Sequence, residues 1–215
     1  MATFALLYTE AQNSTSYLPK GLKLAERMLT ASSPSEGCST GALVSCLDRV
    51  LASTKNAVAV ERLLTFTGML CAAHPGLLLS PTLAHAAGRL DAKDKGVRLR
   101  ACQLVAAVTA AMPEDAELDD ALFTSLVKHL LARSRDKQAA VRAAAASALA
   151  RLQDGGAARI DPARAQLAWL VRHDGSKDVR SAALRALQLD VDSLPLLVEH
   201  TRDVAAEVRA AGERW

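Results

Sequence analysis

Residues 136–152 read DKQAAVRAAAASALARL, and this stretch decides the fold. Asp136 is followed by Val141-Arg142, which opens a run of alanine and leucine. The apolar residues of the run recur in steps of three and four, so they share one face of a helix. An aspartate in front of a helix accepts from unpaired backbone N–H groups and meets the positive end of the helix dipole. The stretch therefore predicts an amphipathic helix with an aspartate at its start. The predicted apolar stripe is Val141, Ala144, Ala145, Ala148, Leu149 and Leu152.

The same pattern occurs three more times, beginning at Asp94, Asp174 and Asp203. The four valines, at positions 97, 141, 179 and 208, lie 44, 38 and 29 residues apart. A weaker copy runs from Asn56 to Arg62. Periods near 40 residues made of helical pairs are typical of HEAT and armadillo repeats. We therefore predict an all-α fold, an α-solenoid of HEAT repeats with about five to six helix pairs in a right-handed superhelix.

The breaks between apolar runs set the expected helix boundaries. Residues 31–41 are rich in Ser, Pro and Gly and predict a linker, and Pro75-Gly76 predicts a firm stop. One solenoid is expected over residues 1–215. Since the sequence ends within a helix and shows no polar capping repeat, we expect it to be truncated at its C-terminal end. The expected helices cover 5–31 (a hairpin with Pro19 opening its second helix), 42–52, 57–73, 81–90, 96–111, 119–132, 138–152, 162–172, 178–189, 193–201 and 204–215.

Composition supports helices and gives little indication of chemistry. Half of the 215 residues are apolar but only 3% are aromatic, and alanine and leucine dominate. The four cysteines form no C-x-x-C pair, which predicts reduced, mostly buried thiols in an intracellular protein. Residues 63–79 are apolar enough to consider a membrane span. The interruption His74-Pro75-Gly76 favours a buried repeat helix instead.

The segment 97–154 carries a more specific signal. It contains VR-x-R-x-CQL, MPE-x-A-x-x-DD, RDK-x-x-x-VR and ALARLQD in this order. With these motifs it closely resembles the G-type HEAT-repeat subunits of condensin. DGSKDVR at 174–180 and LPLLVEHTRDVAAEVR at 194–209 resemble the next two repeats of that family. Residues 58–66 and 10–24 are weaker matches to its opening repeats.

This resemblance implies a scaffold rather than an enzyme. Such subunits bind the kleisin subunit of condensin, and the two together clamp double-stranded DNA in a basic groove, alongside other condensin subunits that hold the ATPase. The process is mitotic chromosome condensation, which places the protein on chromosomes in the nucleus and allows a cytoplasmic pool as well. No cofactor, small-molecule substrate or membrane is implied.

The distribution of charge suggests where DNA would bind. The net charge is only +3, but residues 121–151 hold six basic residues against the single acid Asp136. Basic residues cluster at the turns between paired helices, where stacked repeats would align them into a stripe that follows phosphates. The simpler alternative is that these side chains are solvated. The candidate DNA-binding residues are Lys93, Lys95, Arg100, Arg133, Arg135 and Lys137.

The arginines of the Val-Arg pattern have a structural interpretation. We expect Arg142, Arg180 and Arg209 to pair with an aspartate of a neighbouring repeat rather than with DNA. Ser33, which precedes Pro34 in the linker, is a candidate phosphorylation site. The acidic cluster at 114–120 is expected to start a helix rather than to bind a metal.

Two other functional classes remain open. One is an unrelated HEAT-repeat scaffold of the transport-receptor or phosphatase-scaffold type, which binds protein alone. The other is an enzyme carried on repeats, such as a HEAT-repeat hydroxylase. The latter needs metal ligands, and the five histidines show no ligand spacing with each other or with cysteine.

Overall fold

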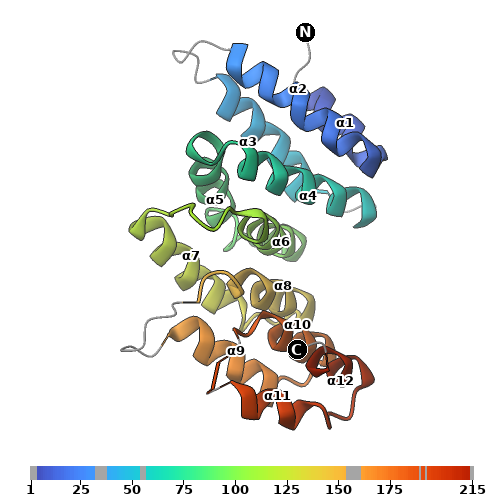
Figure 1. The fold of residues 1–215 in the computed structure, drawn as a ribbon, viewed down its shortest axis with the longest axis vertical. Helices are drawn as coiled ribbons and strands as arrows, with labels where there is room; N and C mark the ends of the chain where they lie inside the picture. Colours follow the sequence, from blue (N-terminus) through green and yellow to red (C-terminus); the bar gives the residue numbers. More distant parts are fainter. Residues whose placement is uncertain are drawn as a thin grey trace. The chain divides into compact units, whose positions relative to one another are not determined.

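The computed structural model describes residues 4–31, 38–53, 57–153, 161–188, 190–191 and 193–213. Within these ranges all regular structure is helical, which confirms the predicted fold class (Figure 1). The elements are α1 (Phe4–Asn13), the 3-10 turn η1 (Thr15–Tyr17), α2 (Leu18–Ala31), α3 (Cys38–Leu51), α4 (Ala57–Ala73), the π-helical turn η2 (Pro75–Leu79), α5 (Ser80–Ala87), α6 (Lys95–Ala111), α7 (Asp120–Arg133), α8 (Ala139–Leu149), α9 (Pro162–His173), α10 (Lys177–Ala186), α11 (Leu194–His200) and α12 (Ala206–Gly212).

The helices form two compact units, Met1–Leu122 and Phe123–Trp215. In the first unit α1 packs on α3 and α4, and α6 packs on α3, α4 and α5. In the second unit α10 packs on α8, α9 and α12, and α11 packs on α12. In both units, second helices of consecutive pairs pack together, α4 with α6 and α8 with α10 and then α12. This is the layered arrangement of HEAT repeats. That residues 1–215 form one right-handed solenoid stays a prediction.

Aspartates start the helices as the sequence predicted. Asp94 Oδ1 accepts from the backbone N–H groups of Gly96 and Val97 at 2.7 and 3.0 Å, at the start of α6. Asp119 Oδ1 accepts in the same way from residues 121 and 122 at the start of α7. Asp161 caps α9 through Ala163 N at 2.8 Å. The acidic cluster therefore contributes a helix cap, as expected.

The buried face of α8 is wider than the predicted stripe. Of the stripe on α8, Val141 and Leu149 are buried but Ala144 is half-buried, while Ala146, outside the stripe, is fully buried. The cause is the layered packing. A second helix of a pair contacts neighbours on two sides, so one stripe cannot cover all its contacts.

Several helix boundaries differ from the sequence-based expectation; α5 and α8, for example, end at Ala87 and Leu149, three residues early. Helix α3 begins at Cys38, so the last residues of the expected linker 31–41 are helical, and residues 32–37 lie outside the described part. Helix α4 ends at Ala73 as expected, but the chain then makes the π-helical turn η2 instead of stopping. Pro75 opens that turn without loss, because the first N–H groups of a helical turn have no partner. Helix α10 ends at Ala186, where Leu187 turns extended.

Two close approaches define the core of the first unit. The ring of Tyr8 meets that of Phe66 edge-on, with centroids 5.7 Å apart and planes at 74°. Gly68 on α4 lies against α6, where an added Cβ would stand 2.5 Å from the carbonyl oxygen of Ala107. Glycine is needed here because the two helix backbones are nearly in contact.

Candidate nucleic-acid interface

The first basic turn precedes α6. Lys93 and Lys95 are exposed, and no other residue in the described part of the chain bonds to their ammonium groups. Arg100 differs, because it is half-buried and its Nη1 donates to Gln103 Oε1 at 2.8 Å. The turn itself is held from within by Arg98, whose Nη1 donates to the carbonyl oxygens of Ala92 and Lys93, both at 2.9 Å. Of the three candidate residues here, the two lysines present a charge that can meet a phosphate.

The second basic turn joins α7 and α8. Lys137 is exposed and has no side-chain partner among the described residues. Arg133 is half-buried, and its Nη1 lies 3.5 Å from Asp136 Oδ2. Arg135 is exposed, and its Nη2 donates to Oε1 of the buried Gln166 at 3.0 Å. The turn therefore offers one unpaired lysine and one arginine whose guanidinium is anchored on α9.

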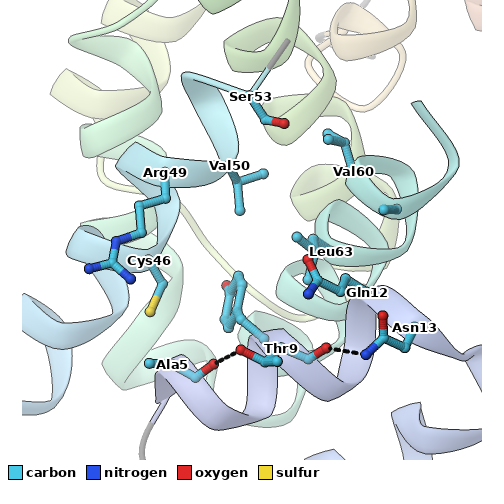
Figure 2. Close-up of a pocket in the computed structure, with 12 residues that line it drawn as sticks. Ala5, Thr9, Gln12, Asn13, Cys46, Arg49, Val50, Ser53, Val60 and Leu63 are labelled. Carbon is cyan, nitrogen blue, oxygen red and sulfur yellow. Dashed lines mark hydrogen bonds between the residues drawn. The ribbon is translucent and has the colours of Figure 1, made fainter. Parts of the chain in front are cut away.

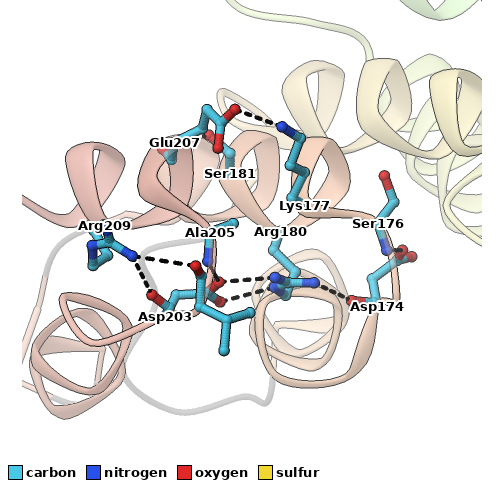
Figure 3. A network of polar contacts seen from close by, with 10 residues as sticks. Asp174, Ser176, Lys177, Arg180, Ser181, Asp203, Ala205, Glu207 and Arg209 are labelled. Carbon is cyan, nitrogen blue, oxygen red and sulfur yellow. Dashed lines mark hydrogen bonds and ion pairs between the residues drawn. The ribbon is translucent and has the colours of Figure 1, made fainter.

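Arg142 and Arg180 of the Val-Arg pattern pair with aspartates of the following repeat, as predicted, whereas Arg209 donates to the carbonyl oxygens of Asp203 and Val204. Arg142 Nε and Nη2 donate to the carboxylate of Asp174 at 2.7 and 2.9 Å. Arg180 Nε and Nη2 donate to Asp203 at 2.9 and 2.8 Å (Figure 3). Two parallel bonds to one carboxylate are the strongest arrangement that a guanidinium makes. These arginines are occupied within the protein.

Each of these aspartates also holds its own turn. Asp174 Oδ1 accepts from Ser176 N at 2.9 Å, and Asp203 Oδ1 accepts from Ala205 N at 2.8 Å. Burial disfavours the charge of Asp174, but the hydrogen bonds from Arg142 and Ser176 outweigh it and lower the pKa of its carboxyl group. The hydrogen bond from Arg180 lowers the pKa of Asp203. Both carboxylates stay ionised at neutral pH.

The third and fourth turns lack exposed unpaired lysines. Lys177 Nζ lies 2.5 Å from Glu207 Oε1, which neutralises it (Figure 3). The fourth turn carries Val204 at the position that Lys137 has in the second turn, and this side chain is 93% exposed. Among the described turns, exposed lysines without a partner therefore occur only before α6 and α8, although the fourth turn carries the exposed Arg202.

A groove in the first unit was not expected from the sequence. It has a volume of about 570 Å³ and is lined by α1, α3 and α4 (Figure 2). Polar side chains such as Thr9, Gln12 and Arg49 line it beside apolar ones such as Val50 and Leu63. Its lining comes from residues up to 58 positions apart, so no local pattern could have indicated it.

Several other sequence-based predictions concern metal binding, the cysteines, a membrane span and phosphorylation. Among the described residues no group of His, Cys, Asp and Glu side chains could hold a metal ion. The thiols of Cys46, Cys71 and Cys102 are buried, and burial raises the pKa of Cys71 to about 11. No described helix is both long and apolar enough to cross a membrane. Ser33 lies outside the described residues, so its modification stays a prediction.

Comparisons with known proteins agree with this fold and with the family resemblance. Residues 126–155 match the HEAT repeat model. Condensin complex subunit 3 of Schizosaccharomyces pombe is 36% identical over 148 residues, which cover 68% of this chain and 17% of that protein. The human condensin complex subunit 3 is 36% identical over 119 residues, 55% of this chain and 12% of that protein. The chain thus spans under a fifth of the length of these relatives.

A solved structure shows the same similarity in three dimensions. The crystal structure of the S. pombe condensin Cnd3-Cnd2 subcomplex matches with a TM-score of 0.81 and 29% sequence identity. The match covers 96% of this chain and 26% of that one.

Proposed function

Given that this chain is related to the condensin complex subunit 3 proteins, we propose that it is a non-catalytic HEAT-repeat subunit of condensin. It binds the kleisin subunit and helps to hold double-stranded DNA during mitotic chromosome condensation. Its place of action is then the chromosome in the nucleus. The similarity to the solved S. pombe Cnd3-Cnd2 subcomplex supports the kleisin as the partner.

The observation that carries the DNA-binding part is the pair of basic turns. Lys93, Lys95 and Lys137 are exposed cations without partners in the described structure, and they lie at helix-pair turns. Arg135 adds a fourth cation, held in place by Gln166. Such groups neutralise phosphates and give affinity without reading bases. We assign Arg100 and Arg133 a lesser part, because they are half-buried and bonded within the protein.

The first experiment asks whether the chain forms the proposed complex. The 215-residue chain should retain the kleisin in a pull-down, and the complex should bind a random-sequence duplex at low salt. Retention of the kleisin without any DNA binding would instead support a scaffold that binds protein alone. Failure of both would remove the proposal.

The second experiment maps the DNA contacts with a matched pair of variants. Lys137→Gln and Lys177→Gln each remove one exposed positive charge from a turn of the same unit, but only Lys177 is already paired. We expect Lys137→Gln to weaken binding on all sequences alike and to lower the salt slope by roughly one. Lys177→Gln should leave the slope unchanged. Equal effects of the two variants would contradict the assignment of this turn.

A further inference from the structure

In the first two turns, the arginine of the Val-Arg pattern donates a hydrogen bond from Nη1 to the main-chain carbonyl oxygen of a lysine. We call this contact the backbone grip. Arg98 Nη1 donates to the carbonyl oxygen of Lys93 at 2.9 Å. Arg142 Nη1 donates to the carbonyl oxygens of Asp136 and Lys137 at 2.9 and 3.4 Å. In both turns the gripped lysine stands five positions before the arginine, and its side chain is exposed. The residue whose charge is offered to solvent is thus the residue whose main chain is fixed.

The other two copies make the same grip without a lysine. Arg180 Nη1 donates to the carbonyl oxygen of Asp174 at 3.0 Å, and the residue five positions before this arginine is Gly175. Arg209 Nη1 donates to Asp203 and Val204 at 2.9 and 3.3 Å. The grip is therefore a feature of the repeat, while the lysine is restricted to the two basic turns. Arg180 and Arg209 therefore have a structural role alone, whereas Arg98 and Arg142 also hold the main chain of a lysine.

We propose that Arg98 and Arg142 are positioning residues for phosphate binding, an inference that rests on the proposed function. Each fixes the main chain of a lysine and makes no contact with DNA itself. In Arg142, Nε and Nη2 are engaged by Asp174 and Nη1 by two carbonyl oxygens. A lysine on a fixed main chain has only its side chain left to order when it binds a phosphate, which lowers the entropy cost of binding.

The second unit provides a matched pair of variants. Arg142→Gln and Arg180→Gln each remove a backbone grip and a two-bond contact to a carboxylate that is almost fully buried, Asp174 or Asp203. Both should lower the melting temperature of the chain to a similar extent. Only Arg142→Gln should weaken duplex binding by the chain in complex with the kleisin, raising Kd about fivefold, while Arg180→Gln stays within about twofold. An equal loss of affinity in both variants overturns the proposal.

A double-mutant cycle then tests the route of the effect. If Arg142 acts through Lys137, Arg142→Gln should add nothing to the loss already caused by Lys137→Ala. Additive losses would show that Arg142 touches DNA directly or acts through the fold in general, and either overturns the positioning role. A Lys137→Ala variant that binds DNA normally would instead remove this turn from the proposed function. The two failures are therefore distinguishable.

The first unit gives an independent test that does not depend on the folding of the Arg142→Gln variant. Arg62 Nη1 donates to the carbonyl oxygens of Gln12 and Asn13 at 3.1 and 3.0 Å, the same kind of grip on residues that carry no charge. We expect Arg98→Gln to raise the Kd for duplex DNA about fivefold and Arg62→Gln to leave it within about twofold. The reverse order, or no difference between them, contradicts the inference for the first turn.

Discussion

The phenol oxygen of Tyr8 lies 2.6 Å from the hydroxyl oxygen of Thr67, which joins α1 to α4 across 59 residues of sequence. Thr67 Oγ1 also donates to the carbonyl oxygen of Leu63 at 2.8 Å. Since the threonine proton is used there, the phenol must be the donor in the bond to Thr67. Burial raises the pKa of Tyr8, so the phenol keeps its proton at all ordinary pH values.

This direction of donation predicts unequal effects of two similar substitutions. Thr67→Val leaves the buried phenol without an acceptor and should cost about 1–3 kcal/mol of unfolding free energy. Tyr8→Phe leaves Thr67 bonded to Leu63 and should cost about 1 kcal/mol or less. The double variant should be more stable than Thr67→Val alone. Urea unfolding of the first unit measures all three, and equal losses in the single variants would contradict the assigned donor.

The contact between α4 and α6 predicts a second pair of outcomes. Gly68→Ala places a methyl group 2.5 Å from the carbonyl oxygen of Ala107, so the helices must move apart, at a cost of about 1–3 kcal/mol. Gly76→Ala meets no atom within 4 Å and should be neutral or slightly stabilising. Thermal unfolding compares them. A helix usually favours alanine over glycine. A melting temperature of Gly68→Ala equal to or above that of the unchanged chain would therefore contradict the prediction.

The ionised aspartates predict that the second unit loses stability in acid. The pKa of Asp203 is lowered by its bond from Arg180, and that of Asp174 is lowered by its bonds despite burial. A carboxyl group with a lowered pKa in the folded state stabilises the fold above its unfolded pKa, near 3.9 for aspartate, and this contribution disappears as the pH falls below that value. Melting curves from pH 6 to pH 2.5 should show this decline. The variant with both aspartates changed to asparagine should show a flatter profile.

Breaking one of these ion pairs at neutral pH should be costly. Arg180→Gln leaves the Asp203 carboxylate, whose side chain is 8% exposed, without its charged partner. We expect a loss of about 3 kcal/mol. Lys177→Gln is the contrasting case, because that ion pair is exposed on both sides and its loss should be hard to detect. Chemical denaturation of the two variants checks the contrast.

The thiol of Cys71 should resist alkylation in the folded chain. Its Sγ lies 3.5 Å from Thr82 Oγ1 and 3.8 Å from the carbonyl oxygen of Leu78, and burial raises its pKa to about 11. The thiol therefore stays protonated at pH 8, and the protonated form is not the nucleophile. Mass spectrometry after iodoacetamide treatment should find Cys71 modified only when denaturant is present. Rapid modification without denaturant would show that this part of the core opens readily.

Local features of this fold could be predicted from the sequence because their causes are local. Asp94 and Asp119 start helices through bonds to residues two and three positions away, so residue type and spacing were sufficient. The pairing of Arg142 with an aspartate followed from the repeat of the pattern. That its partner would be Asp174 of the next repeat depends on how helix pairs stack.

Features that depend on packing between distant segments could not be predicted. The anchoring of Arg135 by Gln166 requires α9 to lie beside the turn before α8. Nothing in the amino-acid sequence of either segment indicates this contact. The six basic candidates looked equivalent in the sequence. The structure separates the exposed lysines from Arg100 and Arg133, since bonding and burial depend on neighbours that the sequence does not name.

The double role of Asp174 has a consequence for how the second unit opens. Its carboxylate bonds to Arg142 of one repeat. The same carboxylate accepts from Ser176 N in its own turn, and its carbonyl oxygen accepts from Arg180 Nη1 (Figure 3). A fluctuation that frees one of these groups weakens the others, so neighbouring repeats are energetically coupled. The amide hydrogens of α8 and α10 should therefore exchange with solvent at a common slow rate, as one cooperative unit.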